Sequence, residues 1–197
     1  MEKPFSQACE NNKQPIFDVI LPAFTGRKSV LEIGSGTGQH AVFFASQLTH
    51  LHWQCSDQAE YLPGIRAWIE DAGLSNVAMP LELDVMKPWP LASVPAIFSA
   101  NTVHIMHWPQ VEALFTGIKQ HLDADGDFCL YGPFNYQGAY SSDSNVRFDQ
   151  WLKQRDPGMG IRDIEAIIAL AESAGLQLQN DHAMPANNRL LHFRKQL

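Results

Sequence analysis

The residues of this chain that are best placed to do chemistry lie in the stretch VLEIGSGTGQH, from Val30 to His40. Three glycines, Gly34, Gly36 and Gly38, follow an apolar run that contains one acid, Glu32. Glycines let a backbone turn sharply and approach a ligand closely. A strand that enters a glycine-rich turn before a helix is typical of a nucleotide-like cofactor site. The ligand could be a dinucleotide with a pyrophosphate, or a molecule that presents no phosphate.

The spacing of the glycines argues against a dinucleotide. A dinucleotide turn reads G-x-G-x-x-G, whereas Gln39 stands here where the third glycine would fall. Glu32 projects to the same side of its strand as Gly34. A carboxylate about 6 Å from a pyrophosphate charge would cost about 3 kcal/mol at an effective dielectric constant of about 20. That exceeds the roughly 0.3–1 kcal/mol that a helix N-terminus contributes. The turn therefore favours a ligand with an ammonium and a sulfonium, as in S-adenosylmethionine.

Two further acids lie at the ends of predicted strands and fit the same ligand. Asp57 lies 19 residues after Gly38, where a carboxylate can accept both ribose hydroxyls. The alternative for Asp57 is an N-cap of the next helix, which is compatible with the first role. Asp84 could accept from an adenine amino group while the Val85 N–H faces the ring. The alternative for Asp84 is a solvated loop acid.

Two histidines in NTVHIMHW, His104 and His107, are the candidate catalytic residues. Their side chains titrate near neutral pH, so either could act as a general base. The alternative is that each is bonded to backbone where a loop meets a helix. No third ligand lies at metal-site spacing, so we expect no metal.

The segment from Tyr131 to Trp151 and the stretch RDPGMGIRD are the candidate acceptor site. Loops over the carboxyl edge of such sheets build pockets, and arginines could bind an acidic acceptor. The alternative is a lid that packs on the core without contacting a substrate. The substrate-binding candidates are Tyr131, Phe134, Asn135, Tyr140, Arg147 and Arg155.

Strands that alternate with helices must position these residues. This order predicts a doubly wound α/β fold, with a mostly parallel sheet covered by helices on both faces. Two closing strands joined by a short turn must be antiparallel neighbours, which makes seven strands. The predicted strands are 28–33, 51–57, 77–85, 95–101, 126–134, 176–184 and 188–196, and the predicted helices are 15–24, 39–48, 60–73, 109–122, 144–155 and 161–175. We expect a single domain over 1–197, with an N-terminal cap helix within 1–27 that starts at Pro15, and a lid insertion over 133–160.

The composition excludes several classes of protein. The chain has 197 residues, 45% of them apolar, which indicates a globular protein, and its net charge of −7 argues against nucleic acid as a partner. No apolar run approaches the roughly 18 residues of a membrane span, so we expect no membrane partner. Three cysteines without a CxxC motif, and the lack of a signal peptide, predict a cytoplasmic protein.

The motifs VLEIGSGTGQH, CSDQ, ELDV and LYGPF together resemble those of class I S-adenosylmethionine-dependent methyltransferases, over residues 28 to 135. ENNKQPI, NTVHIMHW, RDPGMGIRD and MPANN resemble a domain-of-unknown-function family of methyltransferase-like proteins, over nearly the whole chain. The first resemblance implies the fold and the cofactor. The D/N-P-P-Y/F motif of those class I enzymes that methylate amino groups of DNA and glutamine is absent, since ANTVHIM stands there. By position the first resemblance implies the cofactor-binding residues Glu32, Gly34, Ser35, Gly36, Gly38, Asp57, Gln58, Asp84, Val85 and Asn101.

The sequence thus predicts an S-adenosylmethionine-dependent methyltransferase that acts on a small-molecule acceptor. A non-catalytic protein that binds the cofactor as a sensor or partner subunit is the alternative, because no residue is unmistakably catalytic. A nicotinamide-dependent oxidoreductase is a third reading, which Glu32 and Gln39 disfavour.

Overall fold

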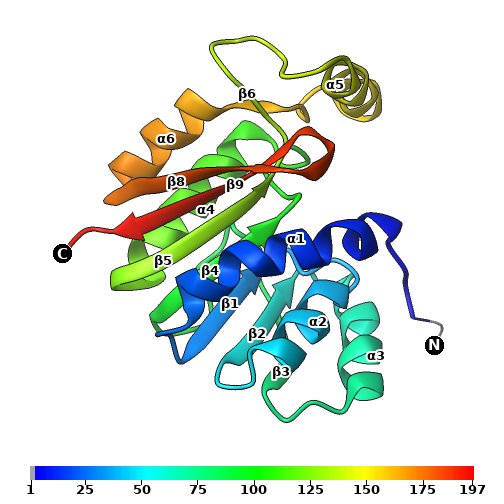
Figure 1. Cartoon of the computed structure of the whole chain (residues 1–197), viewed down its shortest axis with the longest axis vertical. Helices are drawn as coiled ribbons and strands as arrows, with labels where there is room; N and C mark the ends of the chain where they lie inside the picture. The colour runs from blue at the N-terminus through cyan, green and yellow to red at the C-terminus, as the bar shows by residue number, and fades with distance from the viewer. Residues whose placement is uncertain (1–2) are drawn as a thin grey trace.

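The computed structural model of the protein describes residues 3–197, and its centre is one seven-stranded sheet in the order β3-β2-β1-β4-β5-β9-β8 (Figure 1). The first five strands in this order are parallel, β9 is antiparallel to β5, and β8 is antiparallel to β9. This confirms the predicted sheet with its closing hairpin. The strands are β1 (Ser29–Ile33), β2 (His52–Asp57), β3 (Val77–Glu82), β4 (Val94–Ala100), β5 (Leu122–Gly132), β8 (Leu176–Met184) and β9 (Asn188–Lys195).

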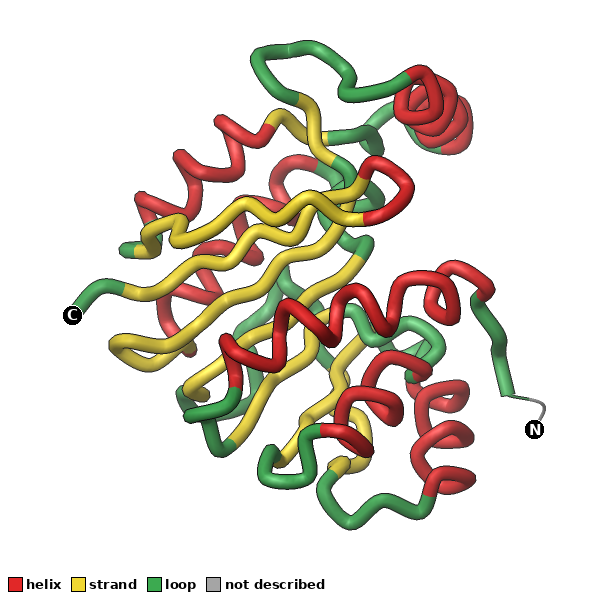
Figure 2. The backbone as a smooth tube through the Cα atoms, in the orientation of Figure 1, coloured by secondary structure: helices red, strands yellow, loops and turns green. Residues whose placement is uncertain are grey.

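Helices cover both faces of the sheet (Figure 2). Alternate residues of a strand point to opposite faces, so Val30 packs in one apolar cluster and Leu31 and Ile33 pack in the other. The first cluster contains residues of α1 (Gln7–Phe24), α2 (Gln39–Gln47) and α3 (Leu62–Ala72), and the second contains residues of α4 (Trp108–His121) and α6 (Ile164–Ser173). None of the described helices is both long and apolar enough to cross a membrane.

The first helix begins earlier than the sequence predicted. We expected a start at Pro15, because proline favours the first helical turn, but α1 begins eight residues before it, at Gln7. The Ser6 side chain caps this start by accepting a hydrogen bond from the Cys9 N–H at 3.3 Å. Pro15 therefore lies inside the helix, where it cannot donate to the carbonyl of Asn11. Side-chain contacts with α2 hold the first turns of α1 in place.

Residues beyond the end of β5 form a second, two-stranded sheet. Here β6 (Phe134–Asn135) pairs in parallel with β7 (Arg162–Asp163). The predicted fifth strand is therefore divided, and the predicted helix at 161–175 starts only at Ile164. Between β6 and β7 the chain forms α5 (Asp143–Arg155).

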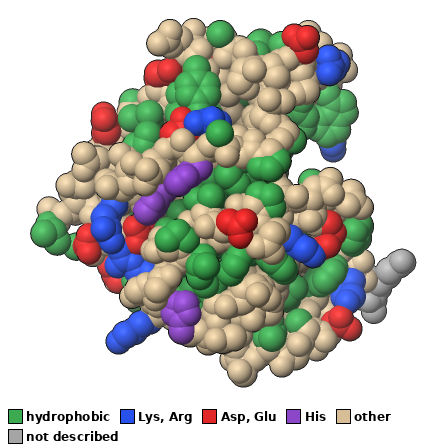
Figure 3. Space-filling model, viewed as in Figure 1, with side chains coloured by type: hydrophobic (Ala, Val, Ile, Leu, Met, Phe, Trp, Pro, Cys, Tyr) green, Lys and Arg blue, Asp and Glu red, His purple; other side chains and the backbone are tan. Residues whose placement is uncertain are grey.

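The segment 133–160 and the β8–β9 hairpin meet over the carboxyl ends of the parallel strands (Figure 1). The hairpin turn is η1 (Pro185–Asn187). Asn187 Nδ2 donates to Ser144 Oγ at 3.2 Å, and Asn145 Nδ2 donates to the Asn187 carbonyl at 3.3 Å. The N-terminal end of α1 lies on the other side of this edge. Figure 3 shows a notch in the margin of the molecule between these two parts.

Candidate functional site

The glycine loop between β1 and α2 has a backbone that only glycine adopts without strain. Gly34, Gly36 and Gly38 have φ angles of 73°, 58° and 89°, all in the left-handed region. The N–H groups of Gly34 and Ser35 both donate to the Ser56 carbonyl at 3.0 Å. The loop is therefore tied to the end of β2, the strand that carries Asp57.

Glu32 lies buried beneath this loop, with 1% of its surface exposed. Its Oε2 atom accepts from Ser35 Oγ at 2.9 Å and from Trp53 Nε1 at 3.0 Å. Within residues 3–197, Oε1 has no hydrogen-bond partner. Burial raises the pKa of Glu32 to about 7, and the nearby Asp57 charge adds to the rise. A cation beside the free oxygen would stabilise the ionised form.

Asp57 flanks the same loop from the end of β2. Its Oδ2 atom accepts from the Gly36 N–H at 2.7 Å, and its Oδ1 atom accepts from the Gln58 N–H at 2.8 Å. Burial raises its pKa, although both N–H groups oppose the rise. A Cβ placed on Gly36 would have no atom within 4 Å, so there is open space beside the loop. The structure thus brings Glu32, the glycine loop and Asp57 together, with each of the two acids hydrogen-bonded to the loop.

Asp84, Val85 and Asn101 follow the neighbouring strands at the same edge. Asp84 lies two residues past the end of β3, and its Oδ1 atom accepts from the Met86 N–H at 3.0 Å. Val85 is half-buried against the α4 side of the core. Asn101 has a φ of 59° and donates its N–H to the Tyr131 carbonyl at 2.8 Å. These contacts shape the turns that follow β3 and β4.

The two candidate histidines differ in burial. His104 is 4% exposed, its ring meets Phe148 edge-on with centroids 5.3 Å apart, and burial lowers its pKa to about 4. His107 is half-exposed, and its Nε2 atom lies 2.8 Å from Asp156 Oδ2. Across residues 3–197, no three His, Cys, Asp or Glu side chains gather as a metal ion would require.

The six predicted substrate residues do not share one surface. Tyr131 packs in the apolar cluster on the α1 side of the sheet, and Phe134 packs in the cluster on the opposite side. Asn135 is buried, and its Oδ1 atom is unpartnered within the described chain. The other three lie on or near α5: Tyr140 donates its hydroxyl to Asp149, whereas Arg147 and Arg155 are exposed.

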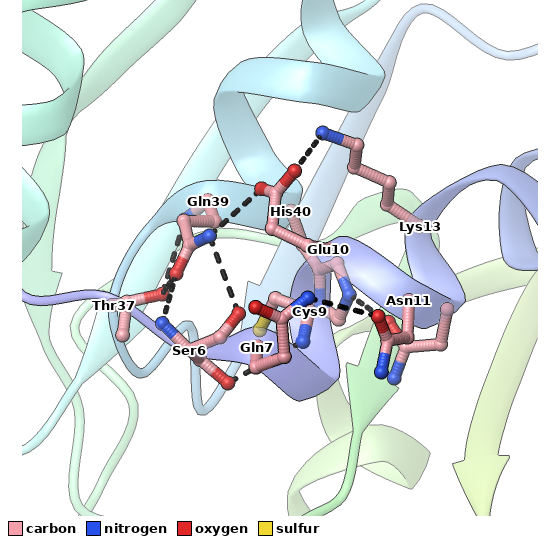
Figure 4. A network of polar contacts seen from close by, with 10 residues as sticks. Ser6, Gln7, Cys9, Glu10, Asn11, Lys13, Thr37, Gln39 and His40 are labelled. Atoms are coloured by element: carbon pink, nitrogen blue, oxygen red, sulfur yellow. Dashed lines mark hydrogen bonds and ion pairs between the residues drawn. The ribbon is translucent and has the colours of Figure 1, made fainter.

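Gln39 connects the glycine loop to the N-terminal end of α1, a role that sequence reasoning missed (Figure 4). Its Oε1 atom accepts from the Ser6 N–H at 2.6 Å and from Thr37 Oγ1 at 3.1 Å. Its Nε2 atom donates to Glu10 Oε1 at 2.8 Å. The glycine pattern indicates Gln39 only as a residue that stands in place of a glycine. The signal available in the sequence was a long polar side chain, glutamine, at the first position of a predicted helix.

A second contact joins the same two helices. His40 Nε2 and Asn12 Oδ1 are 2.6 Å apart, and the His40 ring stacks on Phe44. Burial lowers the pKa of His40 to about 4, so the ring stays neutral at pH 7 and donates from Nε2 to the amide oxygen. Residues 6–12 are thereby held against the start of α2.

Comparison with known proteins identifies the fold. The sequence model of a family described as "Protein of unknown function (DUF938)" matches residues 3–195. An O-methyltransferase family protein from Burkholderia thailandensis superposes with a TM-score of 0.83 at 14% identity, over 93% of this chain and 56% of that one. An O-methyltransferase family 2 protein from Planctomyces limnophilus DSM 3776, solved with apigenin, gives 0.83 at 16% identity, over 94% and 56%.

A third structure extends the likeness to a protein named for its cofactor. The S-adenosylmethionine-dependent methyltransferase SibL, in its apo form, has a TM-score of 0.78 at 19% identity, over 94% of this chain and 56% of that one. The chain thus spans about half the length of the solved structures it matches. At these identities the likeness establishes the fold alone, and this is the fold that the resemblance to class I methyltransferases implied.

Substituting Gly34 should cost more stability than substituting Gly36. Both have left-handed φ angles, but a Cβ on Gly34 would lie 2.5 Å from Thr102 Cγ2, whereas Gly36 faces open space. Gly36→Ala should lower the free energy of unfolding by about 1–2 kcal/mol, and Gly34→Ala by about 1–3 kcal/mol more. Urea denaturation measures both. In a Thr102→Ser background, which lacks Cγ2, Gly34→Ala should cost no more stability than Gly36→Ala. If the two substitutions cost the same stability in the wild-type protein, the contact with Thr102 would be contradicted.

Glu32 should make the protein less stable as pH rises from about 4.5 to 7. Its pKa is about 7 in the folded chain against 4.5 ordinarily, so the folded state binds the proton more tightly across that window. Glu32→Gln keeps an acceptor for Ser35 and Trp53 and carries no charge. We expect the variant to be more stable at pH 8 by an amount on the order of 3 kcal/mol, and equal to the parent near pH 4. Denaturation at several pH values measures the difference, and a constant offset would refute the shifted pKa.

Gln39→Ala should loosen the N-terminal end of α1. Each lost hydrogen bond is worth about 1 kcal/mol, so amides in residues 6–13 should exchange at least about fivefold faster. Hydrogen–deuterium exchange measures this. Gln47→Ala, an exposed change at the end of the same helix α2, is the matched control and should leave those amides unchanged. Equal exchange in both variants would show that Gln39 does not hold the segment.

Proposed function

The chain belongs to the family described as "Protein of unknown function (DUF938)", and we propose that it is an S-adenosylmethionine-dependent methyltransferase with a small-molecule acceptor. The observation that carries the proposal is the glycine loop, with three left-handed glycines between the buried Glu32 and Asp57. Two acids around such a loop disfavour a phosphate and suit a cationic ligand. The fold shared with methyltransferases supports the same choice.

The residues around the loop fit the cofactor. Glu32 has a free carboxylate oxygen for the methionine end, and Gly36 faces open space. Asp57 and Gln58 would hold the ribose, Asp84 and Val85 would hold the adenine, and Asn101 lies where cofactor and acceptor would meet. When bound, the cofactor supplies a methyl group on a sulfonium, and the protein aligns an acceptor atom with it.

We take the acceptor atom to be a hydroxyl oxygen. Two of the matched structures are described as O-methyltransferase family proteins. A hydroxyl must lose its proton during methylation, so a base is useful. Burial lowers the pKa of His104 to about 4, which makes it a weak proton acceptor. The half-exposed His107, paired with Asp156, is the better candidate.

One observation favours the alternative of a non-catalytic sensor that binds the cofactor. Tyr131 and Phe134, both predicted to contact an acceptor, pack on opposite faces of the sheet and have almost no exposed surface. The acceptor site would then rest on the turn 101–107 and α5. Turnover distinguishes the two functions, because a sensor produces no S-adenosylhomocysteine.

Calorimetry tests the cofactor first. Purified protein is titrated with S-adenosylmethionine, S-adenosylhomocysteine and NADH. We expect the first two to bind and NADH not to bind. Binding of NADH alone would overturn the proposal in favour of an oxidoreductase. Incubation with S-adenosylmethionine and a metabolite extract, read as S-adenosylhomocysteine formed, then tests catalysis.

Asp57→Ala should weaken binding of S-adenosylmethionine by about 1–3 kcal/mol, the value of hydrogen bonds to a charged acceptor. Asp57→Asn keeps one oxygen for the Gly36 N–H, so it separates loss of the loop contact from loss of the ribose contact. Glu60→Ala removes an exposed acid three residues away and should leave the affinity unchanged. The same calorimetric titration provides the measurement. An affinity that is equal in Asp57→Ala and Glu60→Ala would refute the ribose assignment.

A further inference from the structure

Two segments far apart in the sequence are joined beside the candidate bases: the turn 101–107, which follows β4, and the loop 156–162, which follows α5. The Gly160 N–H donates to the His104 carbonyl at 2.9 Å. The Ile161 N–H donates to Asp149 Oδ1 at 2.7 Å, which anchors the loop to α5 as well. The loop therefore bridges the lid helix and the turn that carries both histidines.

Arg162 uses its guanidinium to hold backbone carbonyls. Its Nε atom donates to the Val103 carbonyl at 3.1 Å, and its terminal nitrogen donates to the carbonyls of Met106 and of Gly158, the latter at 2.8 Å. Within residues 3–197 it forms no ion pair, and burial lowers its pKa. The sequence suggested that Arg162 could bind an acidic acceptor. Its contacts instead hold the turn at both sides of His104 and just before His107.

Asp156 determines which nitrogen of His107 carries the proton. Asp156 Oδ2 lies 2.8 Å from His107 Nε2, and Asp156 Oδ1 accepts from the Gly158 N–H at 2.8 Å. The hydrogen bond from His107, followed by that from Gly158, lowers the pKa of Asp156, so it is a carboxylate. A carboxylate only accepts hydrogen bonds, so Nε2 must be protonated. The lone pair of neutral His107 is then on Nδ1.

Gly158 leaves room for the His107 ring. A Cβ on Gly158 would lie 2.6 Å from three ring atoms, Cδ2, Cε1 and Nε2. The φ angle of Gly158 is outside the left-handed region, so its backbone alone does not require glycine. The close approach of the imidazole is what requires it.

From these contacts we infer that Asp156, Gly158 and Arg162 are positioning residues for His107, which they hold with the proton on Nε2, so that the lone pair that would accept the proton of an acceptor hydroxyl is on Nδ1. Asp156 selects the tautomer, Gly158 sets the plane of the ring, and Arg162 holds the backbone that carries it. The proton-accepting role rests on the proposed function, whereas the positioning does not. Because the loop also contacts α5, the base and the acceptor-side segment would move as one unit.

Nitrogen-15 NMR of the full-length protein tests the positioning without any acceptor. Long-range proton–nitrogen spectra distinguish the protonated ring nitrogen from the bare one, and His107→Gln identifies the His107 signals among the eight histidines. We expect neutral His107 in the wild-type protein to carry its proton on Nε2. A proton on Nδ1 would overturn the inference with no need for a variant.

Three variants test the individual residues. Asp156→Asn can donate to Nε2 as well as accept from it, so the ratio of the two tautomers should fall by about tenfold or more. Gly158→Ala should cause a similar loss by displacing the ring. Gly26→Ala is the matched control, since Gly26 has an ordinary φ and no atom within 4 Å of its Cβ position. Arg162→Lys keeps the positive charge but lacks the guanidinium that donates to several carbonyls at once. A change in the His107 signals in this variant would therefore show that the carbonyl contacts position the ring.

The results separate this inference from the proposed function. His107 signals that match the wild type in all three folded variants would refute the positioning roles, even if the protein binds S-adenosylmethionine. Conversely, a failure to bind S-adenosylmethionine would refute the proposed function while the tautomer of His107 stayed as expected.

Discussion

The constraint on which the rest of the structure depends is the buried carboxylate of Glu32 beneath a loop of left-handed glycines. Burying a carboxylate is costly unless it is hydrogen-bonded, and here Ser35 and Trp53 supply the bonds. Ser35 belongs to the loop and Trp53 to β2, so the acid joins the loop to the neighbouring strand. The other carboxylate oxygen has no hydrogen-bond partner among residues 3–197. Burial raises the pKa of Glu32 to about 7, so a cation is the partner that would relieve the cost.

On both sides of the carboxyl edge, side chains hold the segments that follow or cover the strands. Toward the N-terminus, Gln39 and His40 hold the first turns of α1. On the other side, β4 and β5 end at Ala100 and Gly132, and the chain continues into segments held by the β8–β9 hairpin and by Arg162. Edge loops are usually the mobile part of such folds. Here side chains tie each of them to a neighbour, which suits the alignment of cofactor and acceptor in the function that we propose.

Local patterns in the sequence predicted most elements, and the exceptions have physical causes. The apolar alternation of the strands and the hairpin at 176–196 needed no tertiary information. The start of α1 was predicted wrongly because Pro15 is a good first-turn residue by itself, whereas the Ser6 cap and Gln39 support a longer helix. The pairing of β6 with β7 was missed because two-residue strands have no periodicity to detect.

The sequence by itself determined the order of the elements, the glycine loop and the acids beside it, because a strand, a turn and a helix are specified by neighbouring residues. Only the tertiary structure decided the partners: Gln39 with Glu10, His107 with Asp156, and Tyr131 and Phe134 on opposite faces. Residues as far apart as His107 and Asp156 meet only after the strand order has been set. A hydrogen bond depends on distances of about 3 Å, and packing of the whole sheet and its helices sets those distances.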